Sequence, residues 1–362
     1  MARSLFRSRI VIGLLVATFL VCLGWLGLPP GQGDSAAQSG QPPHATGIAR
    51  AIEVKDRHES YLMAHPDVVG TAAGLTDDGQ PAVKVYTKRP GVAGLPDSLE
   101  GTAVVVEATG EFFALQPSKK DPPSDKGKGG GTAISTTSAW IQPVPIGVST
   151  GNAGECSAGT IGARVKNGTV VYALSNNHVY ALENQAPLGS EVLQPGRYDT
   201  SCAYDSANKI GTLSAFEPID FSTSAINTID AAIAVSSATD LGNATPSNGY
   251  GLPRSAIAPE FVGQKVQKYG RTSQLTRGQV TGVNATVNIG YSSGTARFVN
   301  QIIVGSGKSP FIKAGDSGSL LVTDPGRNPV GLLYAGTSSG KTAIANRIEL
   351  VLGKFGVTID GE

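Results

Sequence analysis

The chain has 362 residues, which leaves room for a leader and two or three compact units with a sizeable core. Lys and Arg number 29 against 28 Asp and Glu, and the resulting net charge of +1 argues against nucleic acid or an acidic protein as a partner. Many short Val/Ile/Thr runs between turn residues, with 47 glycines and only 16% charged residues, indicate a mostly β protein.

Residues 1–37 are predicted to be a signal peptide or an N-terminal membrane anchor. Three arginines precede an apolar run at residues 10–28, which is just long enough to cross a bilayer. Ser35 and Ala37 have the small-residue spacing of a cleavage site after Ala37, which favours release over anchoring. In both cases the arginines hold the start of the chain inside, so the rest is expected to be secreted or to lie outside the cytoplasm on a membrane anchor.

A polar spacer is predicted at residues 38–47, followed by a small α+β domain at residues 48–115 that we interpret as a pro-region or regulatory module. Asp77 and Asp78 stand in TDDGQ, which predicts a hairpin turn more strongly than a calcium site. The domain is expected to contain a helix at 48–63 and strands at 68–75, 81–87 and 103–108.

Residues 116–135 are predicted to be a flexible linker, because PSKKDPPSDKGKGGG is charged, proline-bearing and then glycine-rich. Strands without interleaved helices follow in residues 136–362, which favours closed antiparallel barrels or a sandwich. The expected strands are 160–165, 170–175, 209–213, 229–235, 262–269, 278–289, 298–304, 319–322 and 329–334. Apolar residues at helical spacing from Ile344 to Phe355 predict a C-terminal helix docked on the second β unit.

Cys156 and Cys202 are the two cysteines outside the leader, since Cys22 lies within it. An even pair in an oxidising compartment predicts one disulfide, and unlinked buried thiols are the alternative. The bridge would close a loop of about 46 residues around His178, worth about 3 to 4 kcal/mol in the chain-entropy model. We expect no metal site, because no histidine lies at ligand spacing from either cysteine.

The segment KAGDSGSLLV, residues 313–322, is interpreted as a nucleophile loop around Ser317. Gly315 and Gly318 permit backbone conformations closed to residues with a Cβ, so the amides of Gly315 and Ser317 are expected to form an oxyanion hole. The alternative is a glycine-rich hairpin turn between two strands.

Two further residues are candidate partners of Ser317. His178 follows an apolar strand in LSNNHVYA and is a candidate general base, with a surface loop histidine as the alternative. Asp230 opens the apolar run AAIAV and is the preferred acid over Asp220, while a structural cap or turn role is the alternative for both.

In the order His178, Asp230, Ser317, the segments NNHV, IDAAIAV and GDSGS together resemble the trypsin-like (chymotrypsin-fold) serine proteases, of the bacterial and plant type with a small N-terminal domain. The resemblance covers roughly residues 136–355. It implies a chymotrypsin-like double β-barrel with the cleft between the barrels. It also implies that Ser317 is the nucleophile, His178 the base and Asp230 its orienter.

The resemblance places Phe311 at the floor of the substrate pocket and Tyr334 and Gly336 on the substrate-pairing strand. An aromatic floor cannot pair with Arg or Lys, so a small or apolar preference is expected. No Ile-Val-Gly-Gly activation terminus precedes the domain, which implies that Asp316 does not wait for a freed N-terminus. Ser319 departs from the usual GDSGG, and Asn177 and Val179 replace the Ala and Cys beside the histidine of animal trypsins.

The predicted function is an exported serine endopeptidase that uses no cofactor or metal and acts on protein or peptide substrates, with membrane attachment possible through the leader. A catalytically silent trypsin-like scaffold that binds protein partners is the alternative. A third candidate is nucleotide binding, since AGTSSGKT at residues 335–342 resembles a phosphate-binding loop. Ala335 replaces its first glycine and no βαβ pattern surrounds it, so a polar hairpin is the better interpretation.

Overall fold

The structure of the protein is a computed structural model that describes residues 44–116 and 134–362. The predicted leader, and most of the predicted spacer and linker, lie outside these residues. Within the two described ranges, the search for a helix long and apolar enough to cross a membrane finds none.

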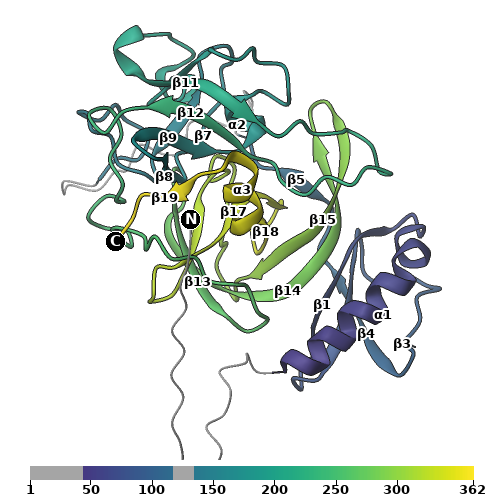
Figure 1. The fold of residues 1–362 in the computed structure, drawn as a ribbon. Coiled ribbons are helices and arrows are strands. Elements are labelled where there is room, and N and C mark those ends of the chain that lie inside the picture. The colour runs from purple at the N-terminus through teal and green to yellow at the C-terminus, as the bar shows by residue number, and fades with distance from the viewer. Residues whose placement is uncertain (1–43, 117–133) are drawn as a thin grey trace, which may run out of the picture. The chain divides into compact units, whose positions relative to one another are not determined.

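Residues 44–116 form one helix against a small sheet (Figure 1). Helix α1 (Ala45–Met63) packs on strands β1 (Val68–Leu75) and β2 (Pro81–Thr87), and its apolar face joins their buried valines in a core. The remaining strands are β3 (Ser98–Leu99), β4 (Thr102–Ala108) and β5 (Phe112–Ala114). As predicted, TDDGQ turns between β1 and β2, and the Thr76 amide donates to the carbonyl of Gln80 at 2.8 Å.

Residues 134–362 contain two β-sheets and two helices of the α type. The first set of elements is β6 (Ser149–Asn152), β7 (Gly159–Thr160), β8 (Ala163–Asn167), β9 (Val170–Ser175), α2 (Asn177–Tyr180), β10 (Glu191–Leu193), β11 (Lys209–Phe216) and β12 (Ala232–Ser236). The second set is β13 (Lys265–Gly270), β14 (Gln274–Tyr291), β15 (Gly294–Gly305), β16 (Leu320–Thr323), β17 (Pro329–Thr337), β18 (Thr342–Arg347), α3 (Ile348–Phe355) and β19 (Thr358–Ile359).

The second set builds a closed barrel. Its strands follow the order β13-β16-β17-β18-β15-β14, and an additional pairing of β13 with β14 closes the ring. Buried aliphatic and aromatic side chains fill the interior, among them Val266, Val280, Phe311 and Leu321. Closure pairs the edge strands and leaves the barrel a rigid support for the loops at its ends.

The first set forms a sheet in the order β19-β8-β9-β12-β11-β10-β6-β7 around its own apolar core. The predicted disulfide is present between Cys156 and Cys202, in the loops that follow β6 and precede β11. The mostly β chymotrypsin-like architecture with a C-terminal helix, predicted from the sequence, is therefore confirmed.

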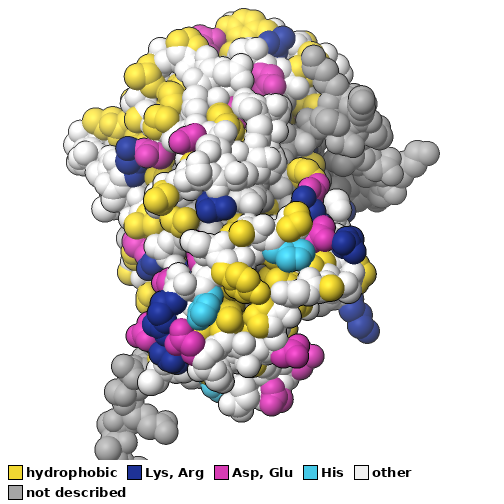
Figure 2. All heavy atoms as spheres, turned by 90° about the vertical axis from the view of Figure 1, so that its right-hand side faces the viewer, with side chains coloured by type: hydrophobic (Ala, Val, Ile, Leu, Met, Phe, Trp, Pro, Cys, Tyr) yellow, Lys and Arg dark blue, Asp and Glu magenta, His cyan; other side chains and the backbone are white. Residues whose placement is uncertain are grey.

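The sheet of residues 44–116 continues the barrel sheet. Strand β1 pairs antiparallel with the long strand β14, with Gly70 opposite Val287 and Thr71 opposite Thr286 (Figure 1). Backbone hydrogen bonds thus join residues 44–116 to the barrel. Figure 2 shows basic and acidic side chains next to one another on one face of the molecule, in keeping with the balanced composition.

Several predicted boundaries are wrong. The first helix begins at Ala45, within the predicted spacer, and the predicted strand at 160–165 is the two strands β7 and β8. Ile344 was expected in the C-terminal helix, but it lies in β18, where it pairs with Ile303 and Ala335. Residues on both faces of β18 are buried, so the strand lacks the alternation that separates it from helical spacing. The helix begins only at Ile348. Residues 335–342 form a hairpin, in which residues 338–341 turn between the antiparallel strands β17 and β18, as the hairpin interpretation predicted.

Candidate active site

His178 lies in the short helix α2, directly after strand β9, and its side chain is fully buried. The corner is fixed by its neighbour Asn176, whose side-chain amide donates to the carbonyl of Asp230 at 2.7 Å. Because β9 pairs with β12, the end of one strand and the start of the other lie together. The sheet therefore brings His178 and Asp230 to one place.

Asp230 holds the imidazole of His178 through one ring nitrogen. Its Oδ2 lies 2.5 Å from Nδ1 of His178, and its Oδ1 accepts from the His178 amide at 3.2 Å. The hydroxyl of Tyr291 donates to the same Oδ2 at 3.0 Å. Burial and then the Asp230 carboxylate raise the pKa of Tyr291 well above its ordinary value, so the hydroxyl keeps its proton and donates. The alternative acid, Asp220, has an exposed side chain.

Ser317 lies in the loop that precedes strand β16 of the barrel, and its hydroxyl donates to peptide carbonyls. Its Oγ donates to the carbonyl of Tyr334 at 3.1 Å or to that of Leu115 at 3.2 Å. Among the described residues, Nε2 of His178 is buried without a hydrogen-bond partner. The direct bond between the Ser317 hydroxyl and this nitrogen is therefore not formed in this state, and such bonds often tighten only when the reacting groups are in place.

The loop around Ser317 depends on its two glycines, as the sequence predicted. Gly315 and Gly318 have φ angles of +94° and +93°, which residues with a side chain rarely adopt. A Cβ on Gly318 would lie 2.2 Å from the hydroxyl of Ser175. The resulting turn exposes the amide of Gly315, which donates to the carbonyl of Leu115 at 2.9 Å. The amide expected to belong to an oxyanion hole therefore holds a peptide carbonyl in this structure.

The carboxylate of Asp316 anchors the loop inside the barrel. It is fully buried and accepts from Nζ of Lys268 at 3.0 Å and from the amides of Thr272, Ser273 and Lys313. Burial by itself raises the pKa of this carboxyl, but the charge of Lys268 and the donated hydrogen bonds outweigh burial and lower it. Asp316 thus has an internal cation as its partner.

The predicted pocket residues lie near Leu115, whose side chain is partly buried. Phe311 is fully buried in the apolar cluster against which Leu115 packs, together with Ile312. Tyr334 offers its carbonyl to the amide of Leu115 at 3.4 Å. A Cβ on Gly336 would lie 3.2 Å from Cδ1 of Leu115, so a side chain there would crowd the pocket.

Three contacts at this site were missed by the sequence analysis. Lys268 had a usable signal, since it is a charged residue in the middle of the strand KVQKYG with buried neighbours on both sides. Tyr291 carried no signal, because it lies at the end of a strand far from Asp230 in the chain. Leu115 carried no signal for a role at this site, and in the sequence analysis it was named only as the expected end of the small domain.

Comparison with known proteins finds likenesses over parts of the chain. The family described as the Nal1 C-terminal domain matches residues 225–354, a range that holds Asp230 and Ser317 but not His178. Streptogrisin-A of Streptomyces griseus is 31% identical over 145 residues, which are 33% of this chain and 46% of that protein. The chain therefore aligns with about half the length of this curated relative. The likeness confirms the resemblance to trypsin-like serine proteases predicted from the sequence.

Solved bacterial proteases also resemble the chain at low identity. A glutamic acid-specific serine protease is 23% identical, with a TM-score of 0.44, and the alignment covers 60% of this chain and all of that one. Thermobifida fusca protease A is 18% identical, with the same TM-score and the same coverage. A chymotrypsin of Cellulomonas bogoriensis is 20% identical, with a TM-score of 0.41, over 60% of this chain and 99% of that one.

Replacing Lys268 by methionine is expected to lower the free energy of unfolding by about 3 to 5 kcal/mol at pH 7, because it leaves the Asp316 carboxylate buried without its cation. The gap to wild type should narrow as the pH falls toward about 4. In wild type the lowered pKa of Asp316 contributes stability that is fully present above the ordinary carboxyl pKa and is lost as the pH falls through the lowered pKa. In the variant, the carboxyl accepts a proton more readily because it lacks the cation. Denaturant unfolding at both pH values measures this.

The matched control is Lys265→Met, on the same strand but with an exposed side chain, which should change the free energy of unfolding by no more than about 0.5 kcal/mol. Equal losses for the two variants, or a Lys268→Met loss that does not depend on pH, would show that the buried pair does not hold the loop.

Proposed function

We propose that the chain is a serine endopeptidase that hydrolyses peptide bonds through an acyl-enzyme on Ser317, with His178 as base and Asp230 as its orienter. The observation that carries the proposal is a peptide carbonyl, that of Leu115, held at 2.9 Å by the amide of Gly315 and at 3.2 Å by the Ser317 hydroxyl. A peptide carbonyl oxygen held by a loop amide beside the serine hydroxyl supports the placement of a substrate carbonyl at this loop.

Each side chain has a distinct task in this proposal. The Ser317 oxygen attacks the carbonyl carbon while its proton passes to Nε2 of His178, the ring nitrogen that has no other partner in the described structure. Asp230 accepts from Nδ1, which selects the reactive tautomer and stabilises the imidazolium that forms. The Gly315 amide receives the developing oxyanion, a contribution worth about 100-fold to 1000-fold in rate. The Ser317 amide is proposed as the second donor.

The pocket supports an apolar specificity. Phe311 and Ile312 belong to the apolar cluster against which the partly buried Leu115 side chain packs. The Asp316 carboxylate next to the loop is already bonded to Lys268. A substrate Lys or Arg would therefore be buried without a partner, at a cost of several kcal/mol. We propose cleavage after apolar residues.

The remaining parts of the chain complete the proposal. The disulfide between Cys156 and Cys202 is typical of proteins outside the cytoplasm, which supports export by the leader at residues 1–37. Residues 136–362 are proposed as the protease domain, joined through the linker at 116–135 to a pro-region or regulatory module at 48–115.

Replacing Ser317 by alanine should lower kcat by a factor on the order of 10⁶ for hydrolysis of a peptide substrate, while circular dichroism reports an unchanged fold. A fluorophosphonate probe should label Ser317 in wild type and fail to label the variant. The matched control is Ser309→Ala, an exposed serine on the preceding loop, which should retain full activity and labelling. Hydrolysis that survives Ser317→Ala would remove Ser317 as the nucleophile, and folded wild type that is neither labelled nor active would favour a silent scaffold.

Replacing Asp230 by asparagine should lower kcat about 10⁴-fold near neutral pH, because an amide at this place favours the wrong tautomer of His178. Asp220→Asn is the control, since this exposed carboxylate was the other acid considered and does not contact His178. Steady-state hydrolysis of one peptide by both variants measures the difference. Similar rates for the two variants would remove Asp230 from the mechanism.

A further inference from the structure

The candidate cleft is filled by a segment of the same chain. Strand β5 lies between two barrel strands, antiparallel to β17 and parallel to β14 (Figure 1). On β17 it pairs with Ala335, Gly336 and Thr337, the segment predicted to hold extended substrates. With this strand in place, the Ser317 side chain has no exposure to solvent.

The residue that follows β5 places its peptide group on the reactive atoms. The amide of Leu115 donates to the carbonyl of Tyr334 at 3.4 Å, and its carbonyl accepts from Gly315 at 2.9 Å and from Ser317 at 3.2 Å. Its side chain packs against the apolar cluster of the pocket. Backbone and side chain of Leu115 therefore both occupy substrate positions.

Gln116, the residue on the other side of the peptide bond that follows Leu115, is also held in place. Its side-chain amide donates to the carbonyl of His178 at 2.6 Å, which ties it to the residue proposed as the base. Its own amide donates to the carbonyl of Ala114 at 3.1 Å, so the chain turns at Leu115 and presents the Leu115 carbonyl to the loop. The peptide bond between Leu115 and Gln116 thus lies between Ser317 and the residue that carries the imidazole.

We propose that the Leu115–Gln116 peptide bond is the first bond this site cleaves, and that the chain cuts itself there. Residues 112–116 then also report the substrate class, namely extended peptides with leucine before the cleaved bond and a polar side chain after it. This inference rests on the proposed function, because it requires Ser317 to act as a nucleophile.

The reaction needs only water in addition to the chain. Ser317 Oγ adds to the Leu115 carbonyl carbon, its proton passes to Nε2 of His178, and the carbonyl electron pair moves to the oxygen held by Gly315. The bond to the Gln116 nitrogen breaks as that nitrogen takes the proton, which leaves a Leu115 ester on Ser317. Water then attacks the ester and gives a proton to His178. His178 passes this proton to the serine oxygen as the ester bond breaks, which leaves a carboxylate at Leu115.

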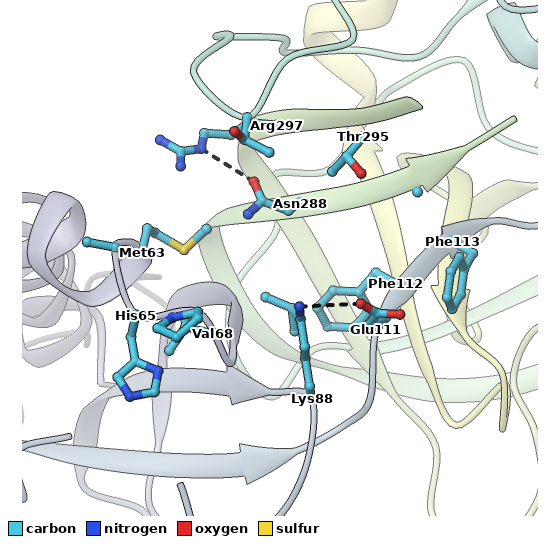
Figure 3. A pocket seen from close by; sticks show the side chains of 15 residues that line it. Met63, His65, Val68, Lys88, Glu111, Phe112, Phe113, Asn288, Thr295 and Arg297 are labelled. Carbon is cyan, nitrogen blue, oxygen red and sulfur yellow. Dashed lines mark hydrogen bonds and ion pairs between the residues drawn. The ribbon is translucent and has the colours of Figure 1, made fainter. Parts of the chain in front are cut away.

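Cleavage by itself does not remove the N-terminal part from the barrel. Strand β1 remains paired with β14, and Phe112 and Phe113 line a cavity of about 390 Å³ together with residues of both parts, including Met63, Lys88 and Arg297 (Figure 3). In this cavity Lys88 lies 3.5 Å from the carboxylate of Glu111. These contacts do not depend on the bond after Leu115, so the two fragments are expected to stay associated and must be separated by denaturation to be counted.

The test is denaturing mass spectrometry of the full-length chain, sampled over time during expression. Wild type is expected to yield a fragment that ends at Leu115 and one that begins at Gln116 or its cyclised form, while Ser317→Ala stays intact. Leu115→Asp should slow this cleavage about 100-fold or more, because it buries a carboxylate in an apolar pocket. The matched control is Phe113→Ala on the same strand, whose side chain is 40% exposed and which should cleave at close to the wild-type rate.

A second arm keeps the test decisive if a variant does not fold. An internally quenched peptide with the sequence GEFFALQPS, residues 110–118, should be cut between Leu and Gln by wild type, and the same peptide with Asp in place of Leu should resist. Failure of wild type to cut either the chain or this peptide at that bond overturns the inference, as does cleavage that persists in Ser317→Ala.

The two hypotheses fail in different ways. If wild type and the full-length Leu115→Asp chain are labelled by a fluorophosphonate at Ser317 and hydrolyse other peptides, yet the Leu115–Gln116 bond stays intact, the inference falls and the proposed function stands. If the Leu115→Asp chain, in which the strand no longer fits the pocket, is neither labelled nor active, both fall.

Discussion

The loop that carries Ser317 depends on one buried charge, the carboxylate of Asp316. Left alone in the barrel interior it would be strongly unfavourable, but Lys268 and three backbone amides donate to it. These bonds fix the peptide units on either side, so that Gly315 turns its amide outward. The direction of that amide, and with it the proposed oxyanion hole, follows from an ion pair in the core of the barrel.

The Lys268 pair also bears on activation. In a protease that waits for a freed N-terminus, the loop takes its working shape only after a cut supplies a cation. Here the cation belongs to β13 of the same barrel, and the loop is already ordered in the intact chain. What separates the intact chain from an open site is strand β5, which occupies the cleft. In our proposal, occupancy of the cleft by β5, and not the ordering of the loop, controls access to the site.

Local patterns were enough to find the parts of the fold that depend on near neighbours. The glycines of GDSGS, the turn in TDDGQ and the strand that ends before His178 each predicted its own conformation. Ile344 shows the limit, because a strand buried on both faces has the same apolar content as a helix. Its pairing with β15 and β17 decides the outcome, and a short apolar run does not encode that pairing.

Contacts between distant segments could not be predicted in the same way. Lys268 and Asp316 are 48 residues apart, and Leu115 and Ser317 are 202 residues apart. Which partners meet is decided by barrel closure and by the pairing of β1 with β14. The sequence indicated His178, Asp230 and Ser317 as a group because each stands in a short motif. No motif marks the peptide segment that lies on them.

The most direct test of the account is to treat the purified wild-type protein with a chloromethyl ketone of the peptide Phe-Phe-Ala-Leu and to map the adduct by mass spectrometry. If Ser317 and His178 act together on the carbonyl that follows an extended apolar strand, the reagent should modify His178, and peptide substrates should no longer be hydrolysed. Modification at another residue, or an active protein without an adduct, would contradict the account.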